Sequence, residues 1–374
     1  MKIVIVVPTY NEVKNIGRLI DALAVEFKKM PQHNFSILVV DDSSPDGTAE
    51  FVEEKSKSLD FVHILLRKEK KGLGAAYISG FKYAMKELNA DVLLEMDADF
   101  QHDPKDITRF ITEIDNGYDY IIGSRFCKGG SIPSQWEFKR KLFSKYGNLF
   151  SKIVLGVKGV KDFTTGYKAS RVRGFVDSID LDNILSTGFA YKTDLLYKMY
   201  KSGARIKEIP IRFGPRDEGS SKMEKNNFMD SLRVVVMLRL RDKDSQKFFK
   251  FCIVGVLGLI TDAGLANIFR VTILSSKDAP LLSGLIAMIV TFTFNNAWSF
   301  SENKINGYVQ RLLYLIAYCV SSYIPVVFRS FLVGLSVKFF GNTFVVFNIA
   351  FFIGIIIGLI WNFMIYSKII WRKK

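Results

Sequence analysis

The last third of the chain carries four apolar stretches, and they constrain its fold more than any other feature. Each covers about 20 residues or more, which at about 1.5 Å per helical residue is enough to cross the roughly 30 Å hydrocarbon layer of a bilayer. Four consecutive stretches of this length are hard to place as core helices of a soluble domain, so we predict an all-α transmembrane four-helix domain over residues 248–374. The stretches are Phe251–Leu274, Leu281–Phe300, Leu312–Val337 and Thr343–Ile365.

Residues 1–225 have a different pattern, which predicts an α/β domain. Short apolar runs typical of strands buried on both faces alternate with longer mixed segments typical of helices, and this alternation indicates a parallel sheet. In such sheets, ligands bind beyond the carboxyl ends of the strands. The predicted strands are Ile3–Val7, Ser36–Asp42, Val62–Arg67, Asp91–Asp99 and Tyr120–Arg125, and the predicted helices are Val13–Lys29, Thr48–Ser58, Gly74–Leu88 and Pro104–Asn116.

Basic residues lie next to the apolar stretches. The connection Ser301–Gly307 taken with Arg311, and the tail after Ile365, are basic, so the positive-inside rule predicts a multi-pass membrane protein with its α/β domain and both termini in the cytoplasm. Residues 226–247 mix basic and apolar side chains and are predicted to be an amphipathic interfacial linker, with Trp136–Leu155 as a second interfacial helix. A solvated helix face is the alternative. The net charge of +15 is therefore assigned to the lipid bilayer and to phosphate-bearing substrates, and no nucleic-acid partner is expected.

Cysteine and histidine are scarce, which narrows the possible chemistry. The three cysteines are scattered without a C-x-x-C pair, and the three histidines are far apart in sequence. These numbers disfavour a disulfide framework, a zinc site and a Ser-His-Asp triad.

The strongest chemical signal is the run DADFQ, from Asp97 to Gln101, at the end of an apolar strand. Asp97 and Asp99 place two carboxylates where a strand gives way to a loop, and such a pair holds a hard divalent cation while it leaves positions for diphosphate oxygens and water. Gln101 adds a neutral oxygen. An EF-hand is excluded because His102 replaces its turn glycine and Thr108 replaces its bidentate glutamate. A polar turn without a metal is the alternative.

Two further strand ends carry polar residues that suit a nucleoside. The pair Asp41–Asp42 ends the second strand, and these carboxylates can accept hydrogen bonds from a nucleobase or a ribose. Ser44 and Asp46, which follow, are predicted to be turn and capping residues. At the first strand end, Tyr10 can cover a base and Glu12 can bond a ribose hydroxyl. No P-loop and no G-x-G-x-x-G run follows, which argues against kinases, ATPases and dinucleotide oxidoreductases.

These strand ends resemble those of the family 2 glycosyltransferases, which have a Rossmann-like GT-A nucleotide-sugar fold. VVPTYNE, VVDDSSPDGT and MDADFQHDP match the family pattern in order. GSRF, WEFKRKLFS, DFTTGYK and FGPRDEGSSK narrow the resemblance to the dolichol-phosphate (polyprenol-phosphate) mannose synthases. In the tail, KFCIVGVLGLITD and NNAWSF are similar to the GtrA-like four-helix membrane domains.

The resemblance also implies roles for particular residues. The residues implied in the nucleoside pocket are Pro8, Tyr10, Glu12, Val40 and Asp42. The residues implied to hold Mg²⁺ or Mn²⁺ are Asp97, Asp99 and Gln101, with the backbone of Ala98 also near the donor. The implied contacts to donor or acceptor phosphate are Arg125, Arg216 and Lys222, and the implied ligands of the lipid phosphate are Arg125, Arg140 and Ser144. Arginine suits these positions because its planar fork matches phosphate. The predicted catalytic residues among them are Asp99, Arg125, Arg140 and Arg216.

The implied reaction is an inverting transfer of mannose from GDP-mannose to dolichyl or polyprenyl phosphate at the cytoplasmic membrane face. A phosphate monoester is mostly dianionic at pH 7, so it attacks without a general base, while arginines offset the repulsion between the two anionic groups. The Q-x-x-R-W signature of processive synthases is absent, because Gln135-Trp136 leads into EFKR. Two alternatives stay open: glucosyl or N-acetylhexosaminyl transfer from a UDP-sugar to the same lipid, and a non-catalytic lipid-translocation subunit.

Overall fold

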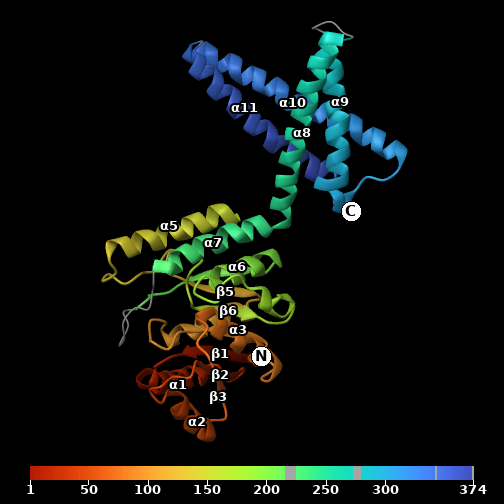
Figure 1. Cartoon of the computed structure of the whole chain (residues 1–374). Helices are drawn as coiled ribbons and strands as arrows, with labels where there is room; N and C mark the ends of the chain where they lie inside the picture. Colours follow the sequence, from red (N-terminus) through yellow and green to blue (C-terminus); the bar gives the residue numbers. More distant parts are fainter. Residues whose placement is uncertain (215–224, 273–278, 342, 373–374) are drawn as a thin grey trace. The chain divides into compact units, whose positions relative to one another are not determined.

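The computed structural model describes residues 1–214, 225–272, 279–341 and 343–372. The chain divides into two compact units, Met1–Arg239 and Leu240–Lys374. The colours of Figure 1 follow the chain, from red through green in the first unit to blue in the second.

The first unit alternates strands and helices along the chain, as the sequence pattern predicts. Its strands are β1 (Lys2–Thr9), β2 (Asn34–Asp41), β3 (Val62–Leu66), β4 (Val92–Glu95), β5 (Tyr120–Ser124), β6 (Lys168–Arg171) and β7 (Ile206–Pro210). Its helices are α1 (Val13–Phe27), α2 (Thr48–Ser58), α3 (Leu73–Lys86), α4 (Ile107–Asp115), α5 (Phe138–Leu155), α6 (Tyr191–Lys201) and α7 (Lys225–Arg241). The five predicted strands and the four predicted helices are all present, whereas β6 and β7 were not predicted.

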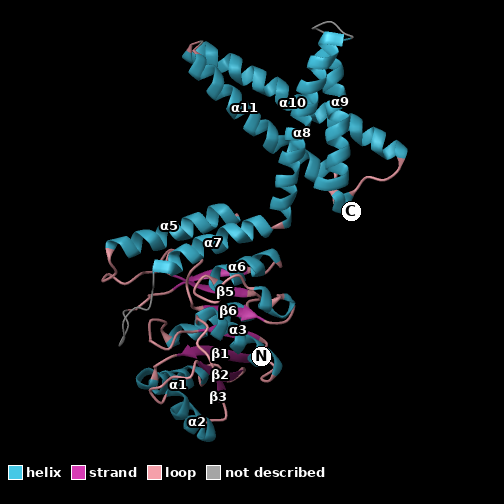
Figure 2. Cartoon of the chain, in the orientation of Figure 1, coloured by secondary structure: helices cyan, strands magenta, loops and turns pink. Residues whose placement is uncertain are grey.

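The seven strands form one mixed sheet in the order β3-β2-β1-β4-β6-β5-β7 (Figure 2). Strand β1 is parallel to β2 and β4, β2 is parallel to β3, and β5 is parallel to β7, but β6 is antiparallel to both β4 and β5. The prediction of a wholly parallel sheet is therefore wrong for β6. Because Glu95 and Ile122 both stand opposite Lys168, the first residue of β6 lies at the edge where β4 and β5 end. This edge is where ligands are expected.

Helices cover both faces of the sheet, so its strands are buried on both sides. Alternate residues of β1 show this division. Ile3 and Ile5 join a cluster with apolar residues of α1 and α4, whereas Val4 and Val6 join a cluster with residues of α3, α6 and α7. The sheet is therefore a rigid support for the loops at its carboxyl edge.

Helices α5 and α7 lie side by side (Figure 1), and the rings of Phe143 and Phe228 meet there with centroids 5.0 Å apart. The outer face of α5 carries an apolar stripe of exposed side chains spaced three or four residues apart. Its members are Phe138, Leu142, Tyr146, Leu149 and Ile153. Exposed lysines flank the stripe at positions 139 and 145, a combination typical of helices that lie in the membrane interface.

The long elements described in the second unit are the helices α8 (Lys243–Thr272), α9 (Ala279–Phe294), α10 (Tyr308–Phe340) and α11 (Phe344–Ile365). Each of the four predicted apolar stretches is thus helical over its described residues except at the end residues Phe300 and Thr343, and Asn295–Ser299 forms a π-helical turn. By length and composition, two segments of the described ranges suffice to cross a bilayer, Lys243–Phe269 and Phe352–Ile370. Large apolar side chains such as Leu259 and Val271 are mostly exposed, which fits a surface that faces lipid.

Candidate active site at the carboxyl edge of the sheet

The two carboxylates of the predicted metal site lie directly beyond β4. The chain turns from Asp97 to Gln101 through Phe100, whose φ of 58° lies in the left-handed region. The side chain of Asp97 is 27% exposed, and Asp99 is 6% exposed. Asp99 Oδ1 accepts a hydrogen bond from the backbone N–H of Gln101 at 3.1 Å, and Asp97 Oδ1 accepts one from the Tyr77 hydroxyl at 3.1 Å. Both carboxylates are therefore held in place by the fold.

The donor set of this turn fits a hard divalent cation. Asp97, Asp99 and Gln101 offer oxygen ligands, which Mg²⁺ and Mn²⁺ prefer. The amide nitrogen of Gln101 donates to the carbonyl oxygen of Gly214 at 3.1 Å, which fixes the amide plane. Across the described ranges, no group of three or more His, Cys, Asp or Glu residues surrounds a common metal position. The turn thus suits a cation that takes its remaining ligands from substrate and water.

The buried side chain of His102 holds the backbone of this turn. Its ring is 1% exposed and stacks on the ring of Tyr167 with centroids 4.8 Å apart. Its Nδ1 accepts a hydrogen bond from the backbone N–H of Asp97 at 3.1 Å. Burial lowers the pKa of His102 to about 4, against the opposing effect of the Asp97 charge. The imidazole is therefore neutral at pH 7 and acts as a positioning residue.

Two cations join the predicted nucleoside residues at the ends of β1, β2 and β3. Arg67 Nη1 lies 2.6 Å from Asp42 Oδ1, and both side chains are nearly buried. Burial raises the pKa of Asp42, although the charge of Arg67 opposes this rise. The Lys70 ammonium lies 3.6 Å from the ring centre of Tyr10. This part of the site therefore combines an aromatic ring, a carboxylate and two cations.

The other predicted nucleoside residues differ in whether a ligand can reach their side chains or only their backbone. Pro8 and Glu12 are half-buried at the same edge, and Glu12 Oε2 accepts a hydrogen bond from the Asn15 amide at 2.9 Å. Val40 is fully buried and packs in the core on the α3 side of the sheet, so only its backbone is left for a ligand. Ala98 is also buried, which agrees with a role for its backbone alone.

The loop after β2 is held together by its own side chains. Ser44 donates to Asp41 Oδ2 at 2.6 Å, and Asp46 accepts from the backbone N–H of Val13 at 3.1 Å, so both have the structural roles that were predicted for them. Asp41 is fully buried and also accepts from the Thr9 hydroxyl at 2.7 Å. The expectation that Asp41 binds the nucleoside is therefore wrong, because its carboxylate is enclosed by the loop.

Arg125 follows β5 and is paired with Asp162, at the start of the loop that leads into β6. Its Nε and Nη2 lie 2.8 Å and 2.7 Å from the two carboxylate oxygens, and Nη2 also donates to the Thr164 hydroxyl. Arg125 is 8% exposed and Asp162 is fully buried. Burial alone would raise the pKa of Asp162, but the Arg125 charge and hydrogen bonds lower it below its usual value. This bidentate pair leaves Arg125 Nη1 for a predicted phosphate contact.

Arg140 and Ser144 lie one turn apart on α5, and both are half-buried. The Arg140 guanidinium carbon lies 4.0 Å from the ring centre of Trp136. One turn further, the Asn148 side-chain oxygen accepts from the backbone N–H of Phe163 at 2.7 Å. This hydrogen bond attaches α5 to the loop that holds Arg125.

Aromatic rings connect the two arginines with the carboxylate turn. The Arg125 guanidinium carbon lies 6.0 Å from the ring centre of Trp136 and 5.4 Å from that of Phe213. The Phe213 ring in turn lies 6.0 Å from Trp136 and 5.5 Å from His102, centre to centre. Arg125 and Arg140 therefore share one aromatic neighbour, and this cluster ends at the residue that supports Asp97. Two other predicted phosphate ligands, Arg216 and Lys222, lie outside the described residues.

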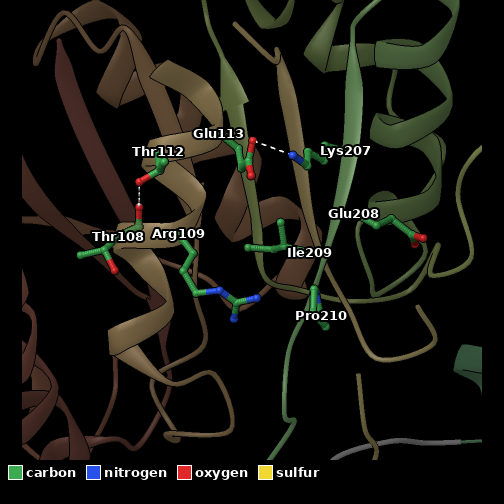
Figure 3. Close-up of a pocket in the computed structure, with 8 residues that line it drawn as sticks. All are labelled: Thr108, Arg109, Thr112, Glu113, Lys207, Glu208, Ile209 and Pro210. Carbon is green, nitrogen blue, oxygen red and sulfur yellow. Dashed lines mark hydrogen bonds and ion pairs between the residues drawn. The ribbon is translucent and has the colours of Figure 1, made fainter. Parts of the chain in front are cut away.

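A separate recess of about 390 Å³ lies between α4 and β7, at the outer edge of the sheet (Figure 3). The ion pair between Glu113 and Lys207, 2.8 Å apart, contributes to its wall. It contains none of the predicted site residues, so its position gives it no part in the chemistry described above.

Sequence reasoning missed several residues that build the site. Arg67 lies just beyond the end of β3, and the rule that ligands meet the carboxyl ends of parallel strands would have drawn attention to it. Asp162 lies in the quoted DFTTGYK run, but its pairing with Arg125 depends on a distant contact. Tyr77 has no local signal, because it stands in an ordinary helix and reaches Asp97 only in the folded unit.

Comparison with known proteins agrees with this geometry. Residues 4–175 match the family described as Glycosyl transferase family 2, and residues 250–371 match the family described as GtrA/DPMS, transmembrane domain. A dolichol-phosphate mannosyltransferase from Pyrococcus furiosus is 33% identical over 314 residues, which cover 84% of this chain and 85% of that protein. A polyprenol monophosphomannose synthase from Mycolicibacterium smegmatis is 37% identical over 64% of this chain and 87% of its own length. An undecaprenyl-phosphate mannosyltransferase from Micrococcus luteus is 39% identical, with 60% and 88% covered.

Proposed function

This chain belongs to the polyprenyl-phosphate mannosyltransferases of glycosyl transferase family 2, and we propose that it transfers mannose from GDP-mannose to a polyprenyl phosphate with inversion at the anomeric carbon. One observation carries the proposal. A row of ring contacts through Trp136, Phe213 and His102 connects the guanidiniums of Arg125 and Arg140 with the carboxylate turn of Asp97 and Asp99. Carboxylates suit a cation-bound donor, and guanidiniums suit an acceptor phosphate.

The donor is proposed to lie across the ends of β1, β2 and β4. Tyr10 and Asp42 are placed to contact its nucleoside, with Arg67 holding the Asp42 carboxylate at 2.6 Å. Asp97, Asp99 and Gln101 would hold the divalent cation, which when bound neutralises the departing diphosphate. His102 keeps the turn in place through the backbone of Asp97.

The acceptor phosphate is proposed to lie on the α5 side of the site. A phosphate monoester has a second pKa near 6, so its oxygen attacks at pH 7 without losing a proton to the protein. Arg140 and Ser144 face the same side of α5 and would hold this phosphate, while Asp162 fixes Arg125 beside them. These cations would offset the repulsion between the phosphate and the donor diphosphate.

The protein is a membrane protein, with its GtrA/DPMS domain at residues 250–371. The catalytic unit and both termini are proposed to face the cytoplasm. The apolar stripe of α5 and the linker at residues 226–247 would lie against the headgroups, where the phosphate of a membrane-anchored polyprenol is found. The site then meets its lipid substrate without extracting it from the bilayer.

A transfer assay with the purified full-length protein tests this function. Polyprenyl phosphate and Mn²⁺ would be supplied with GDP-mannose, UDP-glucose or UDP-N-acetylglucosamine in parallel. We expect mannosyl lipid from GDP-mannose alone, its loss in Asp99→Ala, and no loss in Asp60→Ala, which changes an exposed turn. Transfer from a UDP-sugar would refute the donor assignment, and no transfer from any donor would favour a non-catalytic membrane role.

A further inference from the structure

Two lysines are buried beneath the carboxylate turn, and one of them has a protein counter-charge. Lys168 is fully buried at the start of β6, opposite Glu95 in the sheet register. Glu95 is also fully buried and accepts a hydrogen bond from the Tyr191 hydroxyl at 2.6 Å. The Lys168 ammonium donates to the carbonyl oxygen of Lys192 at 2.9 Å. Opposite charges at Lys168 and Glu95 therefore offset each other inside the unit.

The second lysine, Lys192, shares the charge of Glu95 with Lys168 and has no ion-pair partner of its own. It lies in the first turn of α6 and is 3% exposed. Its ammonium lies 5.3 Å from the ring centre of Phe189. Among the described residues, no carboxylate forms an ion pair with it within 4.0 Å, and no acceptor takes a hydrogen bond from it. A cation is thus nine-tenths buried without a protein anion of its own.

The position of this ammonium is defined by Gly166, in the loop before β6. A Cβ at Gly166 would collide with Lys192 Nζ, and the same point lies 3.3 Å from Asp97 Oδ2 and 3.2 Å from His102 Cε1. The ammonium therefore approaches the carboxylate turn on the side of Asp97. A side chain at position 166 would have to displace the ammonium from this place.

A buried ammonium without a counter-ion destabilises a folded protein, since it loses hydration and gains no partner. Such a cost is typical of functional sites, where a ligand supplies the missing charge. Asp97 Oδ2 lies near the ammonium, but the same carboxylate is the proposed ligand of the divalent cation, so its charge would be shared with that cation when it is bound. We therefore expect an anionic ligand beside the Lys192 ammonium at the Asp97 turn, and a negatively charged phosphate oxygen is such a ligand.

We propose that Lys192 is a substrate-binding residue whose ammonium donates a hydrogen bond to a phosphate oxygen of the donor diphosphate. This inference rests on the proposed function, because it takes a nucleoside diphosphate as the ligand of the Asp97 turn. The donor is favoured over the acceptor phosphate because Asp97, rather than Arg140, is the neighbour of the ammonium. Lys192 would stabilise the negative charge that accumulates as GDP departs.

Substitution Lys192→Met tests the proposal, since methionine keeps an unbranched side chain of similar size and removes the charge. Lys201→Met is the matched control, because Lys201 is exposed at the other end of the same helix. GDP binding to the full-length protein in detergent would be measured by calorimetry, both with Mn²⁺ and in EDTA. We expect Lys192→Met to weaken GDP binding about 10- to 100-fold in both conditions, in line with a hydrogen bond to a charged group. The control should bind GDP as the native protein does.

Thermal unfolding without ligand separates binding from a structural role. Removal of an unpaired buried cation should leave the melting temperature unchanged or raise it, whereas loss of a structural contact would lower it. Lys192→Arg, which keeps the charge, should retain more of the EDTA-resistant GDP binding than Lys192→Met. If Lys192→Met fails to fold, Lys192→Arg is compared with the native protein and Lys201→Met instead, and loss of GDP binding in folded Lys192→Arg as complete as in unfolded protein would count against the proposal.

Three results would overturn the inference. One is unchanged GDP binding in Lys192→Met. Another is unchanged GDP binding with a raised KM for polyprenyl phosphate, which would move Lys192 to the acceptor. The third is equal loss of GDP binding in Lys192→Met and Lys192→Arg with a lowered melting temperature in both. Failure of the proposed function looks different, because the native protein would then bind GDP through Lys192 but form no mannosyl lipid.

Discussion

Substitution of Asp162 by asparagine removes the counter-charge of Arg125 but keeps the size and shape of the side chain. Asp162 accepts hydrogen bonds from Nε, Nη2 and the backbone N–H of Arg125, and from the backbone N–H groups of Thr164 and Thr165. An asparagine amide has one acceptor oxygen in place of two, so some of these buried donors would lose their partners. The variant therefore leaves a guanidinium buried without charge compensation.

The expected cost follows from this burial. Removal of one partner from a buried ion pair destabilises a protein by about 3–5 kcal/mol. In a unit of the size of Met1–Arg239, about 1 kcal/mol lowers the melting temperature by roughly 2–4 °C. Asp162→Asn should therefore lower the melting temperature of the first unit by roughly 6–20 °C.

Amide hydrogen exchange of the full-length protein along a temperature series is the appropriate assay, because it reports β5 and β6 separately from the membrane helices. Asp60→Asn, in the exposed turn between α2 and β3, is the control and should leave the exchange of these strands unchanged. A fall of less than about 2 °C at pH 7 would refute the reasoning, since it would mean that Asp162 is not the group that balances Arg125.

The same pair predicts how the difference between the native protein and Asp162→Asn depends on pH. The pKa of Asp162 is lowered in the folded unit, so its contribution to stability is fully present above the unfolded pKa of about 4. It is lost as the pH falls through the lower folded value. The difference in melting temperature should be constant between about pH 5 and 7 and shrink as the pH falls below about 4; a difference that grows as the pH falls would contradict this account.

Three further substitutions test separate parts of the site. Asp99→Asn should remove the strengthening of GDP binding by Mn²⁺, as measured by calorimetry with and without EDTA, and metal-dependent binding in the variant would argue against the assigned ligand. Arg140→Ala should raise the KM for polyprenyl phosphate about 10- to 100-fold, as measured by initial rates over lipid concentration, and leave GDP binding intact in calorimetry. A change in GDP binding alone would place Arg140 with the donor. Arg67→Met should weaken GDP binding about 10-fold because Asp42 loses its 2.6 Å partner, whereas the exposed Arg173→Met should not.

The elements that the sequence predicted are those whose apolar pattern reports burial directly. Strands β1 to β5 are apolar runs, and the helices between them have one apolar face. Strand β6 gave no such signal, because Lys168 and Ser170 are polar residues that are nevertheless fully buried. Their burial depends on Glu95 and Tyr120 in neighbouring strands, which no local pattern can show. The apolar pattern of the sequence therefore could not predict the antiparallel strand β6.

The site divides in the same way. The DADFQ turn was predictable because its carboxylates are adjacent in sequence and follow an apolar strand. The ion pairs of Asp42 and Arg125 could not be predicted, because their partners come from other segments of the chain. Asp42 pairs with Arg67, and Arg125 pairs with Asp162. The buried Lys192 had no signal at all, because its neighbourhood with Asp97 depends on the approach of the Gly166 loop.

The position of β7 and α7 in the chain has a consequence for biogenesis. Strand β7 completes the sheet by pairing with β5, and Val234, Val235 and Leu238 of α7 complete one side of the core. These segments are synthesised last in the catalytic unit, directly before α8 begins at Lys243. Domains generally fold as units during synthesis, from the N-terminus onward. The enzyme unit therefore cannot complete its sheet and core before translation has reached the first apolar helix, so its folding and the delivery of the nascent chain to the membrane overlap in time.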